Sequence, residues 1–269
     1  MITSNQNSKI KIIRALQGRA KERRETGAFL VEGVRLVEEA ANSNWGFQFA
    51  LYDEVLSERG MSQIESLKSR GIECEMVSTN VMRSLSETET PQGILGVLNS
   101  TQLPIPNHCD FILIPDQIRD PGNLGTLLRT AAAAGVQAVL IPPETTDAFA
   151  PKVIRSGMGA HFRLPIHSMT WDEINQVIKS AGVALSGEAV SKGLQVFLAD
   201  MNGQSCWEID LRQPAALIIG GEAEGASESA RKLTNHKIKI PMIGKIESLN
   251  AGAAGSILMF EVVRQRSNF

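Results

Sequence analysis

The chain has 269 residues, of which 43% are apolar and 21% are charged, and this composition is close to that of ordinary globular proteins. It excludes wholesale disorder and fibrous repeats, and the length allows one large domain or two small ones. Twenty-seven Lys and Arg residues against 29 Asp and Glu residues give a net charge of -2, which excludes the general basic excess of a protein that coats nucleic acid.

The three cysteines, Cys74, Cys109 and Cys206, are widely spaced and form no C-x-x-C pair. This spacing indicates neither a zinc site nor a redox pair, and it fits a reducing compartment. The N-terminus lacks the apolar core of a secretory signal, and no apolar run approaches the ~18 residues of a membrane span. We therefore expect a cytoplasmic protein that binds neither a metal nor a membrane.

The first hundred residues are predicted to form a small α/β unit. Residues 9–24 carry seven basic side chains against one acidic side chain, and Ile12, Ile13 and Leu16 have helical spacing. The cationic face of this helix is either a solvated surface or a contact for nucleic-acid phosphates. The further predicted elements are an amphipathic segment at 29–42, strands at 47–53, 72–78 and 93–98, and a helix at 61–70.

A polar stretch with two prolines, residues 99–107, is interpreted as a linker between a domain at 1–98 and a domain at 108–269. Beyond this linker, apolar strands alternate with helices of roughly ten residues, which predicts βαβ crossovers and a mostly parallel sheet covered on both faces. The strands are expected at 111–116, 136–141, 162–167, 183–188, 215–220 and 237–240, and the helices at 123–135, 147–157, 171–182, 227–235 and 249–265.

The loops that follow the carboxyl ends of parallel strands usually carry the reactive groups, and three of these loops are unusual here. In the first, residues 115–135, a Pro-Gly pair breaks the chain and Asn123 stands where a helix cap belongs. A helix that starts there directs free N–H groups at the site. Arg129 follows on this helix and either faces the site or pairs with a carboxylate, Asp116 or Asp120.

The second loop, residues 217–227, places two consecutive glycines directly after an apolar strand. Such glycines let the backbone approach a ligand closely, although a simple strand-to-helix turn explains them as well. Glu222 and Glu224 suit the positive end of a helix but would repel a pyrophosphate group. The sequence therefore disfavours NAD as a ligand of this loop.

The third loop and the helix after it span residues 239–265. A strand ends at Pro241, and either Ser248 or Asn250 caps a helix whose first turns consist almost entirely of small residues. Two of these residues are glycines, each of which costs about 1 kcal/mol relative to Ala inside a helix. We therefore expect this helix to pack closely against backbone, a ligand or a second subunit.

In their order and spacing, the three loops resemble the signature motifs of the SpoU family of RNA ribose 2'-O-methyltransferases, within the SPOUT superfamily. The first motif has Asn, Gly, Arg and Ala at fixed spacing, the second is G-x-E-x-x-G, and the third joins an I-P-M segment to S-L-N at the last helix. The matching residues are Asn123, Gly125, Arg129 and Ala131, then Gly220, Glu222 and Gly225, then Ile240, Pro241, Met242, Ser248, Leu249 and Asn250.

The resemblance covers essentially the whole chain. Residues from Ser8 to Leu98 resemble the ribosomal-protein-like substrate-binding domain that precedes the catalytic domain in many members. The stretch 151–166 resembles the connecting segment of the family, with Arg155 and Ser156 among the matching positions. One departure is that the family usually continues V-S-V-A after S-L-N, whereas this chain reads A-G-A-A and has Gly252 in place of the serine.

The resemblance implies an α/β fold whose C-terminal parallel-sheet domain contains a trefoil knot, a homodimer formed through that domain, and S-adenosylmethionine as the cofactor. Since a guanidinium group rarely releases its proton, we expect Arg129 to hold a phosphate and stabilise developing alkoxide charge. The implied residues are Arg129, Asn123, Glu222, Ser248 and Asn250 for catalysis, Gly220, Gly221, Ile240, Met242, Leu249 and Asn250 for the cofactor, and Arg23, Arg24, Arg119, Arg155 and Ser156 for the substrate.

A ribosomal-protein-like N-terminal domain is more typical of members that act on ribosomal RNA than of the compact members that modify tRNA. We therefore expect a 2'-O-methyltransferase of 23S-type ribosomal RNA. The alternatives are a tRNA 2'-O-methyltransferase and a non-catalytic RNA-binding or ribosome-assembly protein, which the altered V-S-V-A segment keeps open. An unrelated NAD-dependent oxidoreductase is a further alternative, which the acidic second loop disfavours.

Overall fold

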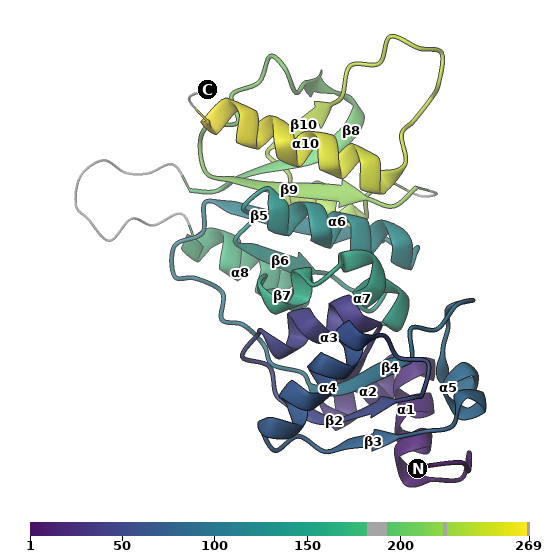
Figure 1. Cartoon of the computed structure of the whole chain (residues 1–269). Helices are drawn as coiled ribbons and strands as arrows, with labels where there is room; N and C mark the ends of the chain where they lie inside the picture. Colours follow the sequence, from purple (N-terminus) through teal and green to yellow (C-terminus); the bar gives the residue numbers. More distant parts are fainter. Residues whose placement is uncertain (182–192, 223–224, 268–269) are drawn as a thin grey trace. The chain divides into compact units, whose positions relative to one another are not determined.

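The computed structural model describes residues 1–181, 193–222 and 225–267. The chain forms two compact units, and each combines segments that are not continuous in the sequence (Figure 1). The first unit comprises Met1–Thr101 and Phe149–Phe162, and the second comprises Gln102–Ala148 and Arg163–Phe269.

The first unit contains a four-stranded sheet in the order β1-β4-β2-β3. Strand β4 is antiparallel to β1 and β2, whereas β2 and β3 are parallel. The strands predicted at 47–53, 72–78 and 93–98 and the helix at 61–70 are confirmed. The strands are β1 (Ala28–Glu32), β2 (Phe47–Tyr52), β3 (Cys74–Met76) and β4 (Ile94–Asn99), and the helices are α1 (Ser8–Gly18), α2 (Ala20–Thr26), α3 (Val34–Ala41), α4 (Glu58–Ser69), α5 (Thr79–Leu85) and α7 (Pro151–Gly157).

Two predictions for the first fifty residues need correction. The basic segment 9–24 is not one helix, because the backbone is extended at Arg19 and separates α1 from α2. The amphipathic segment 29–42 divides at Gly33, whose φ of 97° turns the chain from strand β1 into helix α3. Residues 29–31 are fully apolar and buried, and such a run fits a strand as well as a helix turn.

The segment 149–162 completes an aromatic cluster in the first unit. The rings of Phe29 and Trp45 meet edge to face with centroids 5.3 Å apart, and Phe149 lies 5.2 Å from Phe29. Phe162 packs edge to face on Trp45 at 5.6 Å. These centroid distances are those at which aromatic pairs add stability beyond their buried area. The first unit therefore depends on two rings that come from a later part of the chain.

The second unit contains a six-stranded sheet in the order β10-β8-β9-β5-β6-β7, in which every pairing is parallel. This confirms the mostly parallel sheet predicted from the alternation of strands and helices. Its strands are β5 (Phe111–Asp116), β6 (Ala138–Ile141), β7 (Ile166–Ser168), β8 (Gln195–Ser205), β9 (Ala215–Gly220) and β10 (His236–Lys239), and its helices are α6 (Pro121–Ala133), α8 (Trp171–Ala181), α9 (Glu228–Leu233) and α10 (Ala251–Arg266).

Two strand predictions in this unit are not matched by a described strand over their length, and one observed strand was not predicted. The strand predicted at 183–188 lies outside the described residues. The strand predicted at 162–167 is wrong in most of its length, because the short strand β7 begins at Ile166. Strand β8 was not predicted, because its sequence alternates apolar residues with a polar stretch that includes Asp200, Asn202 and Gly203.

Helices cover both faces of the six-stranded sheet. Ile174 and Ile178 of α8 and Ala230 of α9 join a buried cluster with Ile112 and Ile114 of β5. Helices α6 and α10 pack against each other and against β5 and β9 (Figure 1). From β5 the chain proceeds outward to β6, whereas β9 connects toward β10 on the opposite side. In open α/β sheets, ligands bind at the carboxyl ends of the strands where the order reverses, which here is between β5 and β9.

No helix in the described part of the chain combines the length and the hydropathy needed to cross a membrane. Among these same residues, no three His, Cys, Asp or Glu side chains are grouped so that they could hold a metal ion. All three cysteines are free thiols.

Candidate active site

The loop after β5 brings Asn123 to the strand-order reversal, but not as a helix cap. Asp120 is the N-cap of α6, and its Oδ1 accepts a hydrogen bond from the backbone N–H of Asn123 at 2.8 Å. Pro121 occupies the first helical position, where a missing N–H costs nothing. The predicted cap at Asn123 is therefore wrong, and its side chain is available for other contacts.

Glu222 joins the three motif loops. Its Oε1 accepts hydrogen bonds from Nδ2 of Asn123 at 3.1 Å, from Nδ2 of Asn250 at 2.7 Å and from the backbone N–H of Ala251 at 3.2 Å. The Asn250 amide also donates to Oδ1 of Asn123 at 2.9 Å. Residues almost 130 positions apart therefore meet at one carboxylate, which we call the Glu222 node (Asn123, Glu222 and Asn250).

The cap of the last helix is Asn250 rather than Ser248. The Asn250 Oδ1 accepts from the backbone N–H of Ala253 at 3.2 Å, so this side chain both caps α10 and binds Glu222. Ser248 is exposed and lines a cavity beside the Glu222 node. Its hydroxyl makes no hydrogen bond with any residue that the structure describes, so it remains available to a ligand.

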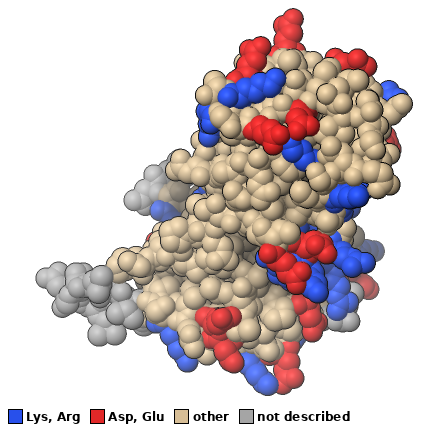
Figure 2. Space-filling view, turned by 90° about the horizontal axis from the view of Figure 1, so that it is seen from below, with Lys and Arg blue, Asp and Glu red and all other residues tan. Residues whose placement is uncertain are grey.

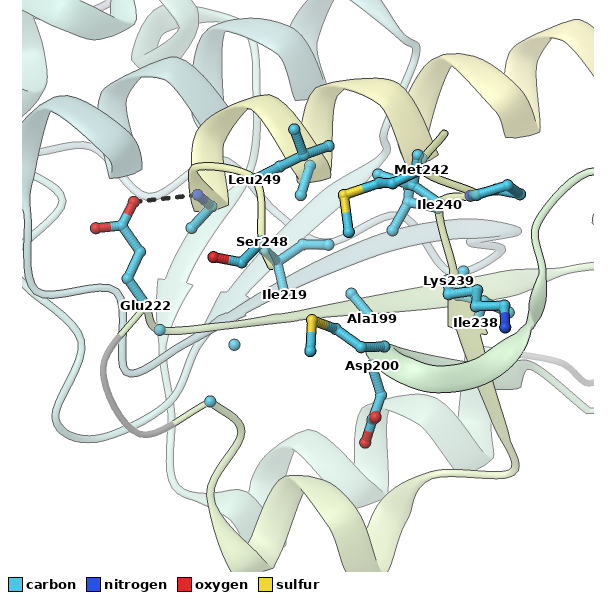
Figure 3. A pocket seen from close by; sticks show the side chains of 18 residues that line it. Ala199, Asp200, Ile219, Glu222, Ile238, Lys239, Ile240, Met242, Ser248 and Leu249 are labelled. Carbon is cyan, nitrogen blue, oxygen red and sulfur yellow. Dashed lines mark hydrogen bonds between the residues drawn. The ribbon is translucent and has the colours of Figure 1, made fainter. Parts of the chain in front are cut away.

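This cavity has a volume of about 480 Å³ and lies at the carboxyl ends of β9 and β10, beside the middle of β8. Figure 3 shows Glu222 near one end and Lys239 near the other, with Ile219, Ile240 and Leu249 between them. The cavity walls are mainly backbone and apolar side chains. Five of the predicted cofactor residues line it, and Asn250 contacts it only through Glu222; the five are Gly220, Gly221, Ile240, Met242 and Leu249.

Two glycines of the second motif are required by close approaches of the backbone. A Cβ atom at Gly220 would lie 2.8 Å from the backbone nitrogen of Ala226, and a Cβ at Gly221 would lie 2.4 Å from the carbonyl oxygen of Gln117. Gly221 and Gly225 also exchange two backbone hydrogen bonds of 3.1 Å. Contacts within the protein therefore require both glycines, as a strand-to-helix turn would, and their close approach to a ligand stays a prediction.

Strand β8 supplies a cavity wall that the sequence did not reveal. Leu198 and Gln204 pair with the adjacent residues Lys237 and Ile238 of β10, so residues 199–203 leave the sheet between them. Ala199, Asp200 and Met201 of this excursion line the cavity.

Asp200 holds the excursion in place. Its carboxylate contacts Lys237 at 3.0 Å and Arg231 at 3.4 Å. The backbone N–H of Asn202 and the nearby Lys237 ammonium hold the pKa of Asp200 below its usual value, although partial burial opposes this shift. The excursion is thus anchored to both α9 and β10 by an ionised carboxylate.

Arg129 is exposed on α6 and makes no hydrogen bond or ion pair with the residues that the structure describes. The alternative pairing with Asp116 or Asp120 is not found. Asp116 is fully buried and accepts from the backbone N–H of Ser227 at 2.6 Å, while Asp120 caps α6. Burial raises the pKa of Asp116, and the Ser227 hydrogen bond partly opposes this shift.

The small residues of α10 pack against α6 of the same chain. A Cβ on Gly255 would lie 2.3 Å from Leu127, and one on Gly252 would lie 3.3 Å from Thr126. The hydroxyls of Thr130 and Ser256 are 2.9 Å apart across the same contact. The two glycines therefore have a packing reason within the chain itself.

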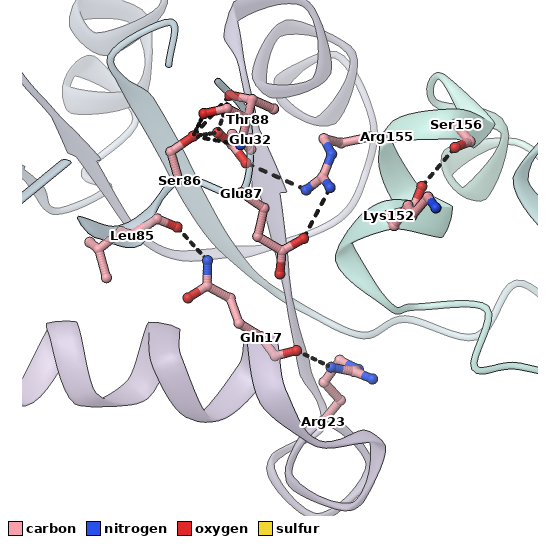
Figure 4. A network of polar contacts seen from close by, with 10 residues as sticks. All are labelled: Gln17, Arg23, Glu32, Leu85, Ser86, Glu87, Thr88, Lys152, Arg155 and Ser156. Carbon is pink, nitrogen blue, oxygen red and sulfur yellow. Dashed lines mark hydrogen bonds and ion pairs between the residues drawn. The ribbon is translucent and has the colours of Figure 1, made fainter. Parts of the chain in front are cut away.

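The substrate residues implied by the resemblance have different surroundings. Arg23 is buried and donates to the carbonyl oxygens of Leu16 and Gln17 at the end of α1; Figure 4 shows the contact with Gln17. Arg23 therefore closes the end of a helix and is not displayed at the surface. Arg24, in contrast, is exposed and makes no side-chain hydrogen bond or ion pair within the described part of the chain.

The connecting segment is also engaged within the first unit. Arg155 contacts Glu32 at 3.5 Å and Glu87 at 3.0 Å, while the Ser156 hydroxyl donates to the carbonyl of Lys152 at 2.8 Å (Figure 4). Both side chains are therefore committed to structural contacts.

Arg119, in the second unit, is 60% exposed and lies 4.0 Å from Glu144. On the face shown in Figure 2, acidic and basic side chains lie beside each other and much of the surface is uncharged. An RNA contact on such a face depends on individual basic groups rather than on a broad positive field.

Comparison with known families gives a match to each unit's main segment. Residues 110–260 match the SpoU rRNA Methylase family, and residues 7–96 match the MRM3-like substrate binding domain. The first match contains the Glu222 node and all residues that line the cavity, and the second contains strands β1 to β3 and the first half of β4.

Two curated relatives span nearly the whole chain. The chain is 35% identical over 97% of its length to the 23S rRNA (guanosine(2553)-2'-O)-methyltransferase RlmP of Bacillus subtilis, of which it covers 98%. It is 32% identical over 98% of its length to an uncharacterized tRNA/rRNA methyltransferase of Synechocystis, of which it covers 94%.

Among solved structures, the chain resembles an AdoMet-bound rRNA methyltransferase from Sinorhizobium meliloti. The TM-score is 0.84 at 28% sequence identity, and the alignment covers 99% of this chain and 98% of the other. The likeness therefore extends over both units.

Proposed function

Because this chain belongs to the SpoU rRNA methylase family, we infer that it transfers the methyl group of S-adenosylmethionine to a ribose 2'-hydroxyl of ribosomal RNA. The observation that carries this inference is the Glu222 node, in which Asn123, Glu222 and Asn250 meet beside a cavity of about 480 Å³. All three motifs converge there, at the place where an open α/β sheet binds its ligand.

The cavity fits the cofactor in size and chemistry. Its volume lies within the roughly 300–1,000 Å³ of small-molecule sites, and such sites combine apolar walls with a few polar groups. The backbone at Gly220, Ile240 and Leu249 would hold the adenosine, while Gly221 and Met242 complete the wall. When bound, the cofactor supplies a methyl group on a positively charged sulfur.

The chain's own residues would position the sugar oxygen and stabilise its charge. An alcohol is a poor nucleophile until its proton is leaving, so the developing negative charge needs a nearby cation. Arg129 would hold the neighbouring phosphate and stabilise this charge. Asn123, Glu222 and Asn250 would fix the loop geometry through their mutual hydrogen bonds, and Ser248 would orient the ribose or the donor.

We also propose a homodimer formed through the second unit and a trefoil knot within it. Ile257 and Phe260 of α10 are 41% and 49% exposed, and large apolar side chains on a helix surface support a subunit contact. The dimer is tested by measuring the molar mass in solution, which should be that of a dimer for the wild type and that of a monomer for an Ile257→Lys variant. We further propose that the protein works in the cytoplasm.

For the first unit we propose a role in binding the RNA substrate. Lys11, Arg19 and Arg24 are exposed, and none of these three side chains contacts a partner in the described part of the chain. Such groups are suited to contact phosphates and release counterions. Arg23, Arg155 and Ser156 are left out of this surface because their side chains are occupied inside the unit.

The test of the proposed function is to map 2'-O-methyl groups in ribosomal RNA and tRNA from cells with and without the protein. We expect one or a few positions in the large ribosomal RNA to lose the methyl group. Calorimetry with S-adenosylmethionine on the purified protein separates the alternatives. A protein that binds RNA without catalysis would not bind the donor, and a tRNA enzyme would change the tRNA map instead.

A further inference from the structure

A second cavity of about 240 Å³ lies beside the cofactor cavity. Gly221, Glu222 and Ala251 line both cavities, so these residues form a shared wall. The other residues around the second cavity come from the loop after β5; they are Gln117, Ile118, Arg119, Asp120 and Asn123. A group bound there would be separated from a methyl donor only by the Glu222 wall.

Gln117, which lines this cavity, and Glu144, which contacts its side chain, both have an unusual backbone conformation. Gln117 has a φ of 54° and Glu144 a φ of 69°, and neither is a glycine. A non-glycine residue in the left-handed region costs on the order of 1–3 kcal/mol and persists only where its surroundings hold it. The Gln117 carbonyl packs against Gly221, and the Thr146 N–H donates to the carbonyl of Ile118 at 2.9 Å.

A hydrogen bond also orients the side chain of Gln117. The Gln117 Nε2 donates a hydrogen bond to Oε2 of Glu144 at 3.1 Å, which fixes the plane and direction of the amide. Its second N–H and its Oε1 have no hydrogen-bond partner within the described residues. Arg119 lies 4.0 Å from the same Glu144 oxygen and adds a positive charge to the rim.

A fixed amide with an adjacent donor and acceptor is suited to pair with the edge of a nucleobase. Proteins that read RNA sequence do so on bases splayed out of the helix, through hydrogen bonds to their edges. The cavity is smaller than the roughly 300–1,000 Å³ of a site that encloses a whole small-molecule ligand, so it is suited to one base rather than a complete nucleotide.

We propose that the second cavity receives the base of the nucleotide that is methylated, and that Gln117 is the residue that reads this base. This proposal rests on the proposed function, because it assumes that the neighbouring cavity holds the methyl donor. Glu144 acts as a positioning residue, since it contacts the amide of Gln117 rather than the base. The left-handed backbone of Gln117 then serves to hold its side-chain amide at the cavity.

The test compares two substitutions at Gln117 that both suit a positive φ. Gln117→Gly removes the amide while relieving the backbone, and Gln117→Asn keeps an amide on a shorter side chain in a residue type that tolerates this region. We expect Gln117→Gly to lower kcat/KM for the methylated position at least tenfold and to raise the share of methyl groups at other nucleotides. Gln117→Asn should retain more of the site preference than Gln117→Gly.

Two measurements and a control variant keep the outcome decisive. Calorimetry with S-adenosylmethionine should give wild-type values for both variants, thermal unfolding should show no loss of stability, and Gln176→Ala on the exposed face of α8 serves as the control. Unchanged kcat/KM and an unchanged methylation map for Gln117→Gly would overturn the proposal. Loss of donor binding or of stability would overturn it too, in favour of a structural role. The proposed function fails separately if the wild type methylates no RNA.

Discussion

Two arginines that the sequence motifs single out have opposite surroundings. Arg155, in the first unit, has a side chain 23% exposed and contacts two carboxylates, Glu32 and Glu87. Arg129, in the second unit, is exposed and has no partner among the described residues. A paired arginine contributes to folding, whereas an exposed arginine without a protein partner is available to a substrate. Motif position alone does not separate these two roles.

Two carboxylates, Glu32 in the first unit and Glu222 in the second, differ in the same way, because only Glu32 contacts a cation within the described ranges. Glu32 has a side chain only 8% exposed and contacts Arg155, with hydroxyl groups of Ser86 and Thr88 also donating to it. Glu222 is exposed and accepts three neutral N–H groups, with no cation contacting it in the described part of the chain. The first carboxylate is paired with a cation of the protein, and the second has no cation partner among the described residues.

The largest expected effect tests the unpaired side of this comparison. Arg129→Ala should reduce methyl transfer at least 100-fold, which corresponds to about 2.7 kcal/mol in the activation free energy. The fold and the binding of S-adenosylmethionine should not change, because Arg129 makes no contact that either requires. Single-turnover kinetics and calorimetry measure the two quantities, with Lys179→Ala on α8 as the control. Near-normal turnover would remove Arg129 from the mechanism.

The structural role of the paired arginine is tested by the substitution Arg155→Ala. This change leaves Glu32 nearly buried without its cation, so the free energy of unfolding should fall by about 2 kcal/mol. Urea denaturation measures the loss. Arg59→Ala is a matched control, because Arg59 also contacts a glutamate but is 65% exposed, and its loss should be below about 1 kcal/mol. Equal losses of unfolding free energy in the two variants would show that Arg155 contributes no more to folding than an exposed arginine.

Asp116 extends the comparison to a buried carboxylate without a cation. Its Oδ1 has no hydrogen-bond partner, and burial raises its pKa in the folded protein. A raised folded pKa means that the folded state binds the proton more tightly than the unfolded state. Its stabilising contribution is therefore complete below the unfolded pKa, near 4, and is lost as pH rises through the folded pKa.

Asp116→Asn mimics the protonated side chain and removes this titration. We expect the variant to exceed the wild type in free energy of unfolding by about 1 kcal/mol at pH 7 and to match it near pH 4. Urea denaturation across this pH range, performed on both proteins, cancels the contributions of the other carboxylates. A constant difference at all pH values would show that Asp116 does not titrate in this way.

The smallest effect concerns the packing of α10 against Thr126 of α6. Gly252→Ser restores the hydroxyl that is usual in the family, but its Cβ would lie 3.2 Å from Oδ1 of Asn250 and 3.3 Å from Thr126. The neighbours must shift by a few tenths of an ångström, so we expect a loss of about 0.5–1 kcal/mol in thermal unfolding. Adding Thr126→Ala should recover most of this loss. No recovery would mean that Asn250, rather than Thr126, limits the space.

The sequence predicted the features of the fold that depend on regular patterns. Alternating apolar strands and helices predicted the parallel sheet, and the order of the three motifs correctly indicated that their loops converge. Side-chain pairing could not be predicted in the same way. Whether Arg23 and Arg155 are surface groups depends on which carbonyls and carboxylates the fold brings near them, and those partners lie up to 123 positions away.

The remaining errors have local causes. Asp120 competes with Asn123 for the helix cap and prevails because a proline follows it at the first helical position. The excursion at 199–203 depends on pairing with β10, which lies more than thirty residues later in the chain. Periodicity describes a segment by itself and does not report such distant partners.

The aromatic cluster of the first unit limits how this protein can be divided or recombined. A fragment cut at Thr101 would keep Phe29 and Trp45 but lose Phe149 and Phe162, which cover them. The first unit therefore cannot be grafted onto another methyltransferase as a simple N-terminal cassette. A successful chimera would have to carry residues 149–162 as well, although in the chain this segment lies between two stretches of the second unit.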